Sequence, residues 1–239
     1  MTQRVFFSGT KNASSWALRA WLALRAANVS FVETIVDIRK PQRYPNLAKI
    51  TRFSPAAQVP VLVVDGVAIF DSLAIMEYAN DCSGGALLPQ DPIARAQARA
   101  VVAWQHGGLS NICQRISFES AFYPYKRELS ADEVSECARV FNWLEELLLT
   151  FQGQFLFGNA TLADFALVPL VVRLTRHGMD FAGWPRTGLW AEVILNHSLV
   201  REWLDHANKL PHIWDDSYLI PGAPVELIPA EHLHPRLHA

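Results

Sequence analysis

Apolar and polar positions in the first third of the chain follow two different periods. Short β-branched or aromatic runs predict strands at 4–7, 31–36, 59–64 and 67–70. Between the first two runs, apolar residues recur at helical spacing as far as Arg25, and Ser14 or Ser15 can cap the first turn of that helix. Because a helix joins these two strands, we expect them to pair in parallel.

The rest of this region predicts a hairpin followed by a helix. Asp65-Gly66 has the composition of a two-residue hairpin turn between the last two strands. Asp71 or Ser72 can cap a helix over 73–80. The segment 37–58 is basic and interrupted by proline, so we expect it to be irregular. The predicted order of elements is βαβ-ββα, which is typical of a small α/β domain.

Strand signals end near residue 92, and only helical periods follow. Helices are predicted over 93–116 (loosened at Gly107-Gly108), from Ser130 to about 151, from Thr161 to about 177, and over 198–209. Ser130 and Thr161 each open a capping box, which Glu133 and Asp164 complete. We therefore expect a first domain over 1–84 and an all-helical domain over 92–239, with an extended proline-rich tail from about 210.

The balance of residue types excludes several classes of protein. Of the 239 residues, 51% are hydrophobic and 18% are charged, which supplies enough apolar material for two packed domains and argues against disorder. The formal net charge of −2 leaves no basic surplus for the phosphates of nucleic acid. We expect no membrane association, because no stretch reaches the roughly 18 apolar residues of a spanning helix and the N-terminus lacks the apolar stretch of a signal peptide.

Cysteine usage bears on the compartment and on metal binding. Cys82, Cys113 and Cys137 are odd in number and widely spaced, so they predict neither a disulfide framework nor a metal motif. A reducing compartment is the simplest interpretation, and we expect the protein to be cytoplasmic. The histidines near the C-terminus lie in the proline-rich tail without a firm scaffold, so we expect no metal site.

Three segments resemble, in order and spacing, motifs of the glutathione transferase superfamily. Residues 54–62 are similar to N-P-x-x-x-V-P-x-L, residues 65–78 to D-G-x-x-x-x-[EQ]-S-x-A-I-x-x-Y, and residues 157–164 to G-x-x-x-[ST]-x-A-D. Ser14-Ser15 also matches the start of the S-S-C motif of the zeta class, so the chain most resembles that class and related bacterial enzymes. The resemblance implies a thioredoxin-like domain, an all-α bundle, glutathione as co-substrate and a homodimer.

The resemblance assigns the thiol chemistry to the start of the first helix. A thiolate is the nucleophile, and a free thiol near pKa ~8.5 is mostly protonated at neutral pH. A hydroxyl donor and a helix N-terminus both favour the anion. Ser14 is our first choice for that hydroxyl and Ser15 the second, and plain helix capping is the alternative for either. Trp16 departs from the Cys that zeta-class enzymes carry there, a thiol tied to isomerase work in that class.

Two further segments are implied to bind glutathione. The Val59-Pro60 peptide bond is implied to be cis, with the Val59 backbone pairing with the cysteinyl part of glutathione. Asp71-Ser72 is implied to hold the γ-glutamyl group: the serine and the helix N-terminus take its carboxylate, and the acidic side chain faces its ammonium. The alternatives are a proline at a strand start and an ordinary capping pair.

The glycyl carboxylate and the second substrate have weaker assignments. Candidate cations for that carboxylate are Arg39, Lys40, Arg43 and Lys49, of which we retain Lys49 and Arg43, and Pro45 stands where the zeta class has a glutamine. Trp104, Leu109 and Ile112 are expected to line an apolar pocket for the second substrate, and core packing is the alternative. His106 and Phe118 lie in the same stretch.

Three functional hypotheses follow from these residues. The first is a glutathione transferase that activates the glutathione thiolate for attack on a small hydrophobic electrophile, or a related glutathione-dependent isomerase or dehalogenase. The second is a non-catalytic protein that binds a ligand or a partner on the same fold. The third, a thiol–disulfide reductase, is disfavoured because the first helix starts with Ser and not with Cys.

Overall fold

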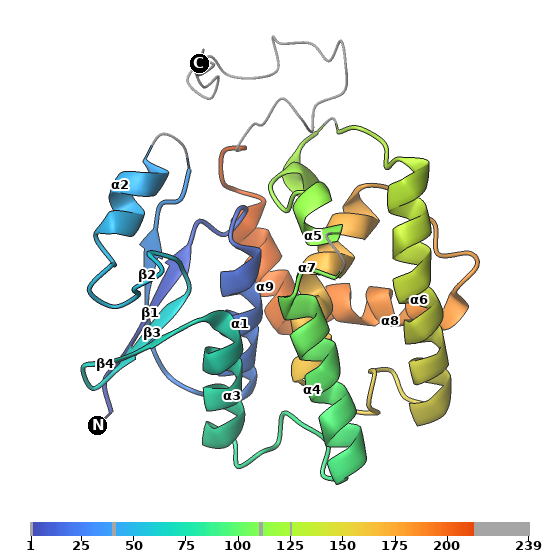
Figure 1. The fold of residues 1–239 in the computed structure, drawn as a ribbon, viewed down its shortest axis with the longest axis horizontal. Helices are drawn as coiled ribbons and strands as arrows, with labels where there is room; N and C mark the ends of the chain where they lie inside the picture. Colours follow the sequence, from blue (N-terminus) through green and yellow to red (C-terminus); the bar gives the residue numbers. More distant parts are fainter. Residues whose placement is uncertain (1, 40–41, 110–111, 125, 213–239) are drawn as a thin grey trace.

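A four-stranded mixed sheet, in the order β2-β1-β3-β4, forms the first part of the molecule (Figure 1). The computed structural model describes residues 2–39, 42–109, 112–124 and 126–212. The strands are β1 (Arg4–Gly9), β2 (Val32–Val36), β3 (Val61–Val64) and β4 (Val67–Phe70). β1 pairs in parallel with β2 and antiparallel with β3, and β3 pairs antiparallel with β4. The predicted strands and the parallel first pair are confirmed.

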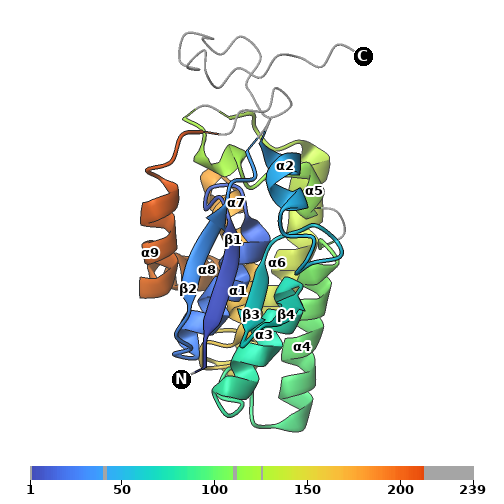
Figure 2. The ribbon, with the colours of Figure 1, turned by 90° about the vertical axis from the view of Figure 1, so that its left-hand side faces the viewer.

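Helices cover both faces of this sheet. Helices α1 (Ser15–Ala26) and α3 (Ser72–Cys82) lie on one face, and α2 (Arg43–Ala48) lies against the other (Figure 2). Strand alternation produces these two layers, because successive side chains point to opposite faces. Phe6 belongs to the main core with α1, whereas Phe7 stacks on Phe53 beside α2, with ring centres 5.2 Å apart. This is the thioredoxin-like arrangement that the resemblance implied.

The prediction for 37–58 was wrong in part, because α2 forms inside it. Pro45 is the third residue of this short helix. A proline is tolerated in the first turn of a helix, where its missing N–H has no intrahelical partner to lose. The proline that suggested an irregular segment is therefore compatible with a helix at this position.

Seven helical elements make up the rest of the described chain. They are α4 (Pro92–His106), α5 (Ile112–Arg115), the 3₁₀ turn η1 (Ser120–Phe122), α6 (Ala131–Phe151), α7 (Leu162–Arg176), α8 (Pro185–Asn196) and α9 (Ser198–Ala207). The helices expected after Ser130, after Thr161 and over 198–209 are confirmed. No helix in the described part of the chain is long and apolar enough to cross a membrane. The predicted tail from about 210 lies almost wholly outside the described residues.

Two helix predictions in this half need correction. The helix expected over 93–116 ends at His106, because Gly108 and Leu109 have φ of 86° and 49° and such left-handed residues stop a helix. Helix α8 was not predicted, since Trp184 provides no side-chain cap. Pro185 at its first position was the one available signal, because proline is favoured there.

Helix α7 is the centre of the helical part and packs against α1, α4 and α8 (Figure 1). Every residue from Leu162 to Leu174 is buried. The helix begins at a capping box in which Asp164, fully buried, accepts from the Thr161 backbone N–H at 2.8 Å and hydroxyl at 2.9 Å. The Leu156 backbone N–H and Trp190 Nε1 also donate to Asp164, at 3.0 Å and 2.9 Å. This carboxylate therefore joins three segments inside the core.

Removing Asp164 should destabilise the protein much more than removing Ser130, the N-cap of α6. Asp164→Ala leaves several buried N–H donors without an acceptor, which should lower the free energy of unfolding by about 3 kcal/mol or more. Ser130→Ala, at the exposed N-cap of α6, should cost only about 1 kcal/mol. Urea denaturation of both variants measures the difference, and equal losses would contradict a central role for Asp164.

Candidate functional site

The end of β1 brings the first helix and the strand before the hairpin into contact. Ser14 is the N-cap of α1, is buried, and its Oγ accepts from the Ala17 backbone N–H at 3.4 Å. A Cβ on Gly9 would lie 2.7 Å from Ser14 Cβ and 3.0 Å from the Val59 Cγ2. Both residues therefore crowd the same point, and only glycine at position 9 allows this approach.

The Val59-Pro60 peptide bond is cis, which confirms the prediction from the resemblance. Pro60 is buried directly before β3, and Val59 is half-buried beside Ser14. The structure thus places the Val59 side chain next to the start of α1.

The start of α3 has a strained residue followed by a buried hydroxyl. Asp71 is the N-cap, its Oδ1 accepts from the Leu73 backbone N–H at 2.7 Å, and its backbone has φ 90° and ψ 131°. A positive φ of this kind costs a non-glycine residue about 1–3 kcal/mol and is found mainly at ligand clamps and active sites. Ser72 is only 3% exposed. The predicted pair Asp71-Ser72 therefore lies at a helix N-terminus whose geometry is unusual.

A buried guanidinium holds Ser72 from α1. Arg19 donates to Ser72 Oγ through Nε at 3.0 Å and through Nη2 at 2.6 Å, and it lies 4.3 Å from the centre of the Trp16 ring. A hydroxyl has two acceptor lone pairs and one donor hydrogen. Since Arg19 uses both lone pairs, the Ser72 hydrogen is directed elsewhere. The sequence analysis gave Arg19 no role in the site, although its position in an apolar helical run was an available signal.

Arg19 also links the sheet domain to α4, where it contacts Gln105 Oε1 and His106 Nδ1. Arginine can only donate, so His106 Nδ1 accepts and its ring N–H is at Nε2, 3.5 Å from Asp71 Oδ2. Burial lowers the pKa of Arg19 to about 9, which still leaves it charged at neutral pH. A fixed positive charge therefore lies beside the N-terminus of α3, and both favour a bound anion.

Ser15 faces a different neighbour from Ser14. Its Oγ accepts from Arg173 Nη2 of α7 at 3.2 Å, and Arg173 also donates from Nε to the Ile116 carbonyl at 2.8 Å. Successive residues at a helix start point about 100° apart. The structure therefore groups Ser14 with Gly9 and Val59, and groups Ser15 with the helical part of the molecule.

The candidate cations between β2 and β3 have separate surroundings. Arg39 forms two bonds to Asp37, at 2.8 Å and 2.6 Å, which hold the pKa of that carboxyl below its ordinary value. Lys49 donates to Asn46 Oδ1 at 2.9 Å. Arg43 is exposed on α2. Lys40 lies outside the described residues.

The residues expected to line the second-substrate pocket lie in or against the core. Leu109 and Ile112 are 0% and 1% exposed, so a ligand could reach them only after movement of the chain. Trp104 is half-buried and packs edge-to-face on Trp143 of α6, with ring centres 5.7 Å apart. Phe118 is 2% exposed and lies 5.2 Å from the Arg173 guanidinium.

Positive charge accumulates between the C-terminal half of α7 and the segment before α6. The Arg176 guanidinium lies 4.5 Å from the centre of the Phe122 ring. Burial lowers the pKa of Lys126, and the charge of Arg176 lowers it further. Burial also lowers the pKa of His177, and the charges of Lys126, Arg127 and Arg173 add to the effect. Because Arg173 reaches Ser15, this cationic group extends to the start of α1.

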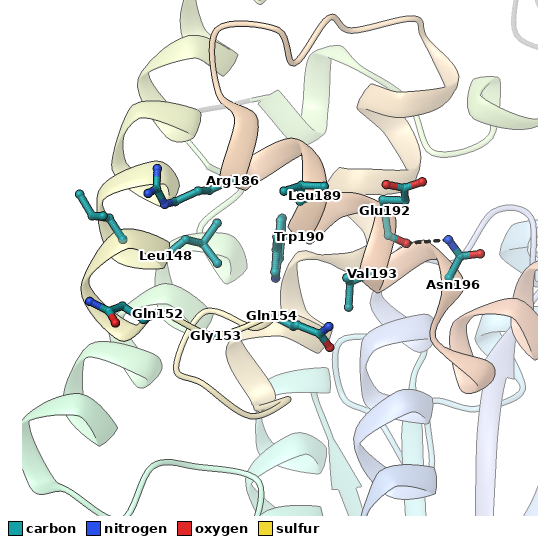
Figure 3. Close-up of a pocket in the computed structure, with 11 residues that line it drawn as sticks. Leu148, Gln152, Gly153, Gln154, Arg186, Leu189, Trp190, Glu192, Val193 and Asn196 are labelled. Atoms are coloured by element: carbon teal, nitrogen blue, oxygen red, sulfur yellow. Dashed lines mark hydrogen bonds between the residues drawn. The ribbon is translucent and has the colours of Figure 1, made fainter.

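A separate cavity of about 680 Å³ opens between α6 and α8 (Figure 3). Its walls combine apolar side chains with several amides; they are Leu148, Leu149, Gln152, Gly153, Gln154, Arg186, Leu189, Trp190, Glu192, Val193 and Asn196. None of the site residues predicted from the sequence is among them. Within the described ranges, no group of three or more His, Cys, Asp or Glu side chains is arranged to hold a metal ion.

Comparisons with known proteins converge on one superfamily. Residues 13–82 match the family described as "Glutathione S-transferase, N-terminal domain". A probable maleylacetoacetate isomerase of Caenorhabditis elegans is 30% identical over 190 residues, which cover 76% of this chain and 83% of that protein. Glutathione S-transferase 1 of Dianthus caryophyllus is 33% identical over 184 residues, covering 72% and 79%. A Sulfitobacter glutathione transferase homologue solved with bound glutathione shares the fold, at TM-score 0.66 and 18% identity, with 86% and 98% covered.

Because Gly9 lies so close to Ser14 and Val59, one methyl group added at position 9 should disturb the site. Gly9→Ala should lower the free energy of unfolding by about 1–3 kcal/mol, because the methyl overpacks Ser14 and Val59. Gly183→Ala is the matched control, since a Cβ there meets nothing within 4 Å. Denaturant unfolding of the two variants should separate them, and a Gly9→Ala protein as stable as the control would argue against the crowding.

Proposed function

The chain belongs to the glutathione transferase superfamily, and we propose that it binds glutathione and activates the glutathione thiol for attack on a small electrophile. The observation that carries the proposal is the grouping of Ser14 and Val59 at the end of β1, with Ser72 held next to α1 by Arg19. Each group suits one part of the glutathione molecule.

Ser14 is the proposed thiol-activating residue. Its Oγ accepts from the Ala17 backbone N–H, which leaves the hydroxyl hydrogen to donate to a thiolate. The N-terminus of α1 adds a positive field at the same place. Both interactions stabilise the anion more than the thiol, so they lower the pKa of bound glutathione. Ser15 is the weaker candidate, because its hydroxyl lies against Arg173 of α7, whereas Ser14 lies beside Val59.

The start of α3 is the proposed site of the γ-glutamyl group. Ser72 can donate its hydroxyl hydrogen to the carboxylate. The positive charge of Arg19, which donates to the Ser72 oxygen, also favours the bound anion. Asp71, exposed enough to meet a ligand, faces the ammonium. The cis peptide before Pro60 leaves the main chain of Val59 to pair with the cysteinyl residue.

The remaining parts of the site are proposed from the resemblance. Arg43 or Lys49 would bind the glycyl carboxylate, and Arg43 is favoured because Lys49 already donates to Asn46. Trp104, Leu109 and Ile112 would contact the second substrate only if the α4–α5 connection moves, because two of them are fully buried.

A glutathione-dependent isomerase is the second candidate function. Relatives of this chain are named maleylacetoacetate isomerases, and the cationic group around Arg173, Arg176 and Lys126 favours an electrophile that carries carboxylates. In a cis–trans isomerisation the thiolate adds to a conjugated double bond, the resulting single bond rotates, and the thiolate leaves again. Glutathione is regenerated in this reaction, whereas a transferase consumes it.

The assembly, domain division and location are also proposals. We propose a homodimer, a domain division between residues 84 and 92, and a cytoplasmic location. The three cysteines are unpaired as disulfides in the structure, and burial raises the pKa of the Cys137 thiol to about 12, which makes it unreactive. Analytical ultracentrifugation tests the dimer directly, and a monomer at micromolar concentration would exclude it.

Substitution of Ser14 should abolish most of the activity without unfolding the protein. Ser14→Ala removes the hydrogen-bond donor, so turnover with 1-chloro-2,4-dinitrobenzene should fall about 100-fold and the pKa of bound glutathione should rise by about one unit or more. Ser15→Ala is the matched control and should retain most of the turnover. Equal losses in both variants would exclude Ser14 as the specific thiol-activating group.

Substitution of Ser72 should weaken glutathione binding. Ser72→Ala removes the donor to the γ-glutamyl carboxylate and leaves two Arg19 N–H groups without their acceptor, so the Kd should rise about tenfold or more. Isothermal titration calorimetry at neutral pH measures the Kd, with Ser130→Ala as a distant serine control. If the wild-type protein binds no glutathione, the non-catalytic hypothesis replaces the enzyme.

The fate of glutathione separates the two candidate enzymes. With maleylacetoacetate as substrate, an isomerase should change the substrate while the concentration of free thiol stays constant. With a chlorinated aromatic electrophile, a transferase should consume one thiol per product. Arg176→Ala should reduce the isomerisation and spare the conjugation, because only the first substrate carries carboxylates for that cation to bind.

A further inference from the structure

The loop between β1 and α1 is buried, although a connecting loop normally lies at the surface. Thr10, Lys11 and Asn12 are 4%, 8% and 1% exposed. The loop leads directly into the N-cap of α1. The backbone N–H groups of Ala13 and Ser14 both donate to the Thr10 carbonyl at 2.9 Å, which ties the N-cap to the loop. The position of the Ser14 hydroxyl therefore depends on what holds this loop.

Helix α9, which lies beside α1 (Figure 1), holds the loop through one side chain. Trp203 is fully buried, and its Nε1 donates to the Lys11 carbonyl at 3.0 Å. Its ring centre is 4.0 Å from Lys11 Nζ and 5.5 Å from the ring centre of Trp21. Trp203 therefore contacts both the main chain and the side chain of Lys11. Without this donor the carbonyl would be buried and unpaired, so the loop would have to move.

Three further contacts restrict the same loop. Asn12 Nδ2 donates to the Pro211 carbonyl, just after α9, at 2.9 Å. Lys11 Nζ pairs with Glu33 of β2 at 2.9 Å. On the side of β2, Thr10 Oγ1 donates to Asp37 at 3.2 Å.

The base of α9 is fixed independently of the loop. Arg25 of α1 makes two bonds to Glu202, at 2.7 Å and 2.9 Å, one residue before Trp203. Helix α9 therefore has a contact with α1 that does not involve the loop, and loss of the indole N–H leaves that contact in place.

We propose that Trp203 and Asn12 are positioning residues for the thiol site, through which the last helix sets the acidity of bound glutathione. This inference rests on the proposed role of Ser14. The helical half of the molecule would then affect the ionisation of glutathione, in addition to its expected contacts with the second substrate. Both residues are buried, and both act through the loop that places the Ser14 hydroxyl.

The test is Trp203→Phe, which keeps an aromatic ring against Trp21 and removes the donor to Lys11 together with part of the ring volume. The thiol pKa of bound glutathione, followed by the ultraviolet absorbance of the thiolate, should rise by about half a unit to one unit. Turnover at neutral pH should fall about three- to tenfold, with a smaller change in KM for glutathione. Trp190→Phe, which removes the buried indole donor to Asp164 far from the loop, should leave the thiol pKa unchanged.

A double variant separates positioning from general loss of structure. In a Ser14→Ala background, Trp203→Phe should have no further effect on the thiol pKa, because the hydroxyl that it positions is gone. An unchanged thiol pKa in Trp203→Phe, or an equal shift in the two backgrounds, would overturn the proposal. If Trp203→Phe does not unfold cooperatively, Asn12→Ala replaces it and should raise the thiol pKa in the same way.

Amide hydrogen exchange tests the loop without glutathione. The Ala13 and Ser14 amides should exchange faster in Trp203→Phe than in the wild type or in Trp190→Phe. If the wild-type protein binds no glutathione, the proposed function fails, and this exchange still decides the loop contact. Faster exchange would then support the hold of Trp203 on the loop, and unchanged exchange would overturn it.

Discussion

Helix α1 must be buried on every side, and the rest of the structure depends on that constraint. It lies between the sheet with α3 on one face and α7 with α9 on the other (Figures 1 and 2). Ala17, Leu18, Ala20, Leu22, Ala23 and Leu24 are all 0% exposed. A helix that is apolar around its circumference needs a second layer, because one sheet can cover only one face. The helical part of the chain is that layer, and α7 supplies most of it.

Burial of α1 also explains how positive charge is arranged near the site. Arg19 of α1 and Arg173 of α7 are both buried; Arg19 donates to Ser72 and Gln105, and Arg173 donates to Ser15 and the Ile116 carbonyl. Arg19 donates to neutral oxygens, so its field is reduced less than it would be in a direct ion pair. An anionic ligand at the start of α3 would meet this fixed charge, which needs no reorganisation.

Ser14 and Ser15 have different neighbours because both lie at the start of the buried helix α1. Ser14 belongs to the sheet side, where Gly9 and Val59 crowd it, and Ser15 belongs to α7. A loop that α9 covers leads into Ser14, so residues from both ends of the chain contribute to the position of one hydroxyl. In the proposed site, this arrangement would make the acidity of a bound thiol sensitive to the packing of the two halves.

Local signals in the sequence determined most of the elements: the four strands, the Asp65-Gly66 turn and the capping boxes at Ser130 and Thr161. These depend on neighbours within a few residues, as does each of the motifs that identified the superfamily. The helix at Arg43–Ala48, the break after His106 and helix α8 had only weak local signals. Tertiary structure alone decided the roles of Arg19 and Trp203. Their partners lie far away in sequence: Ser72 is 53 residues from Arg19, and Lys11 is 192 residues from Trp203. Periodicity carries no information about such contacts, because they exist only once both halves have packed around α1.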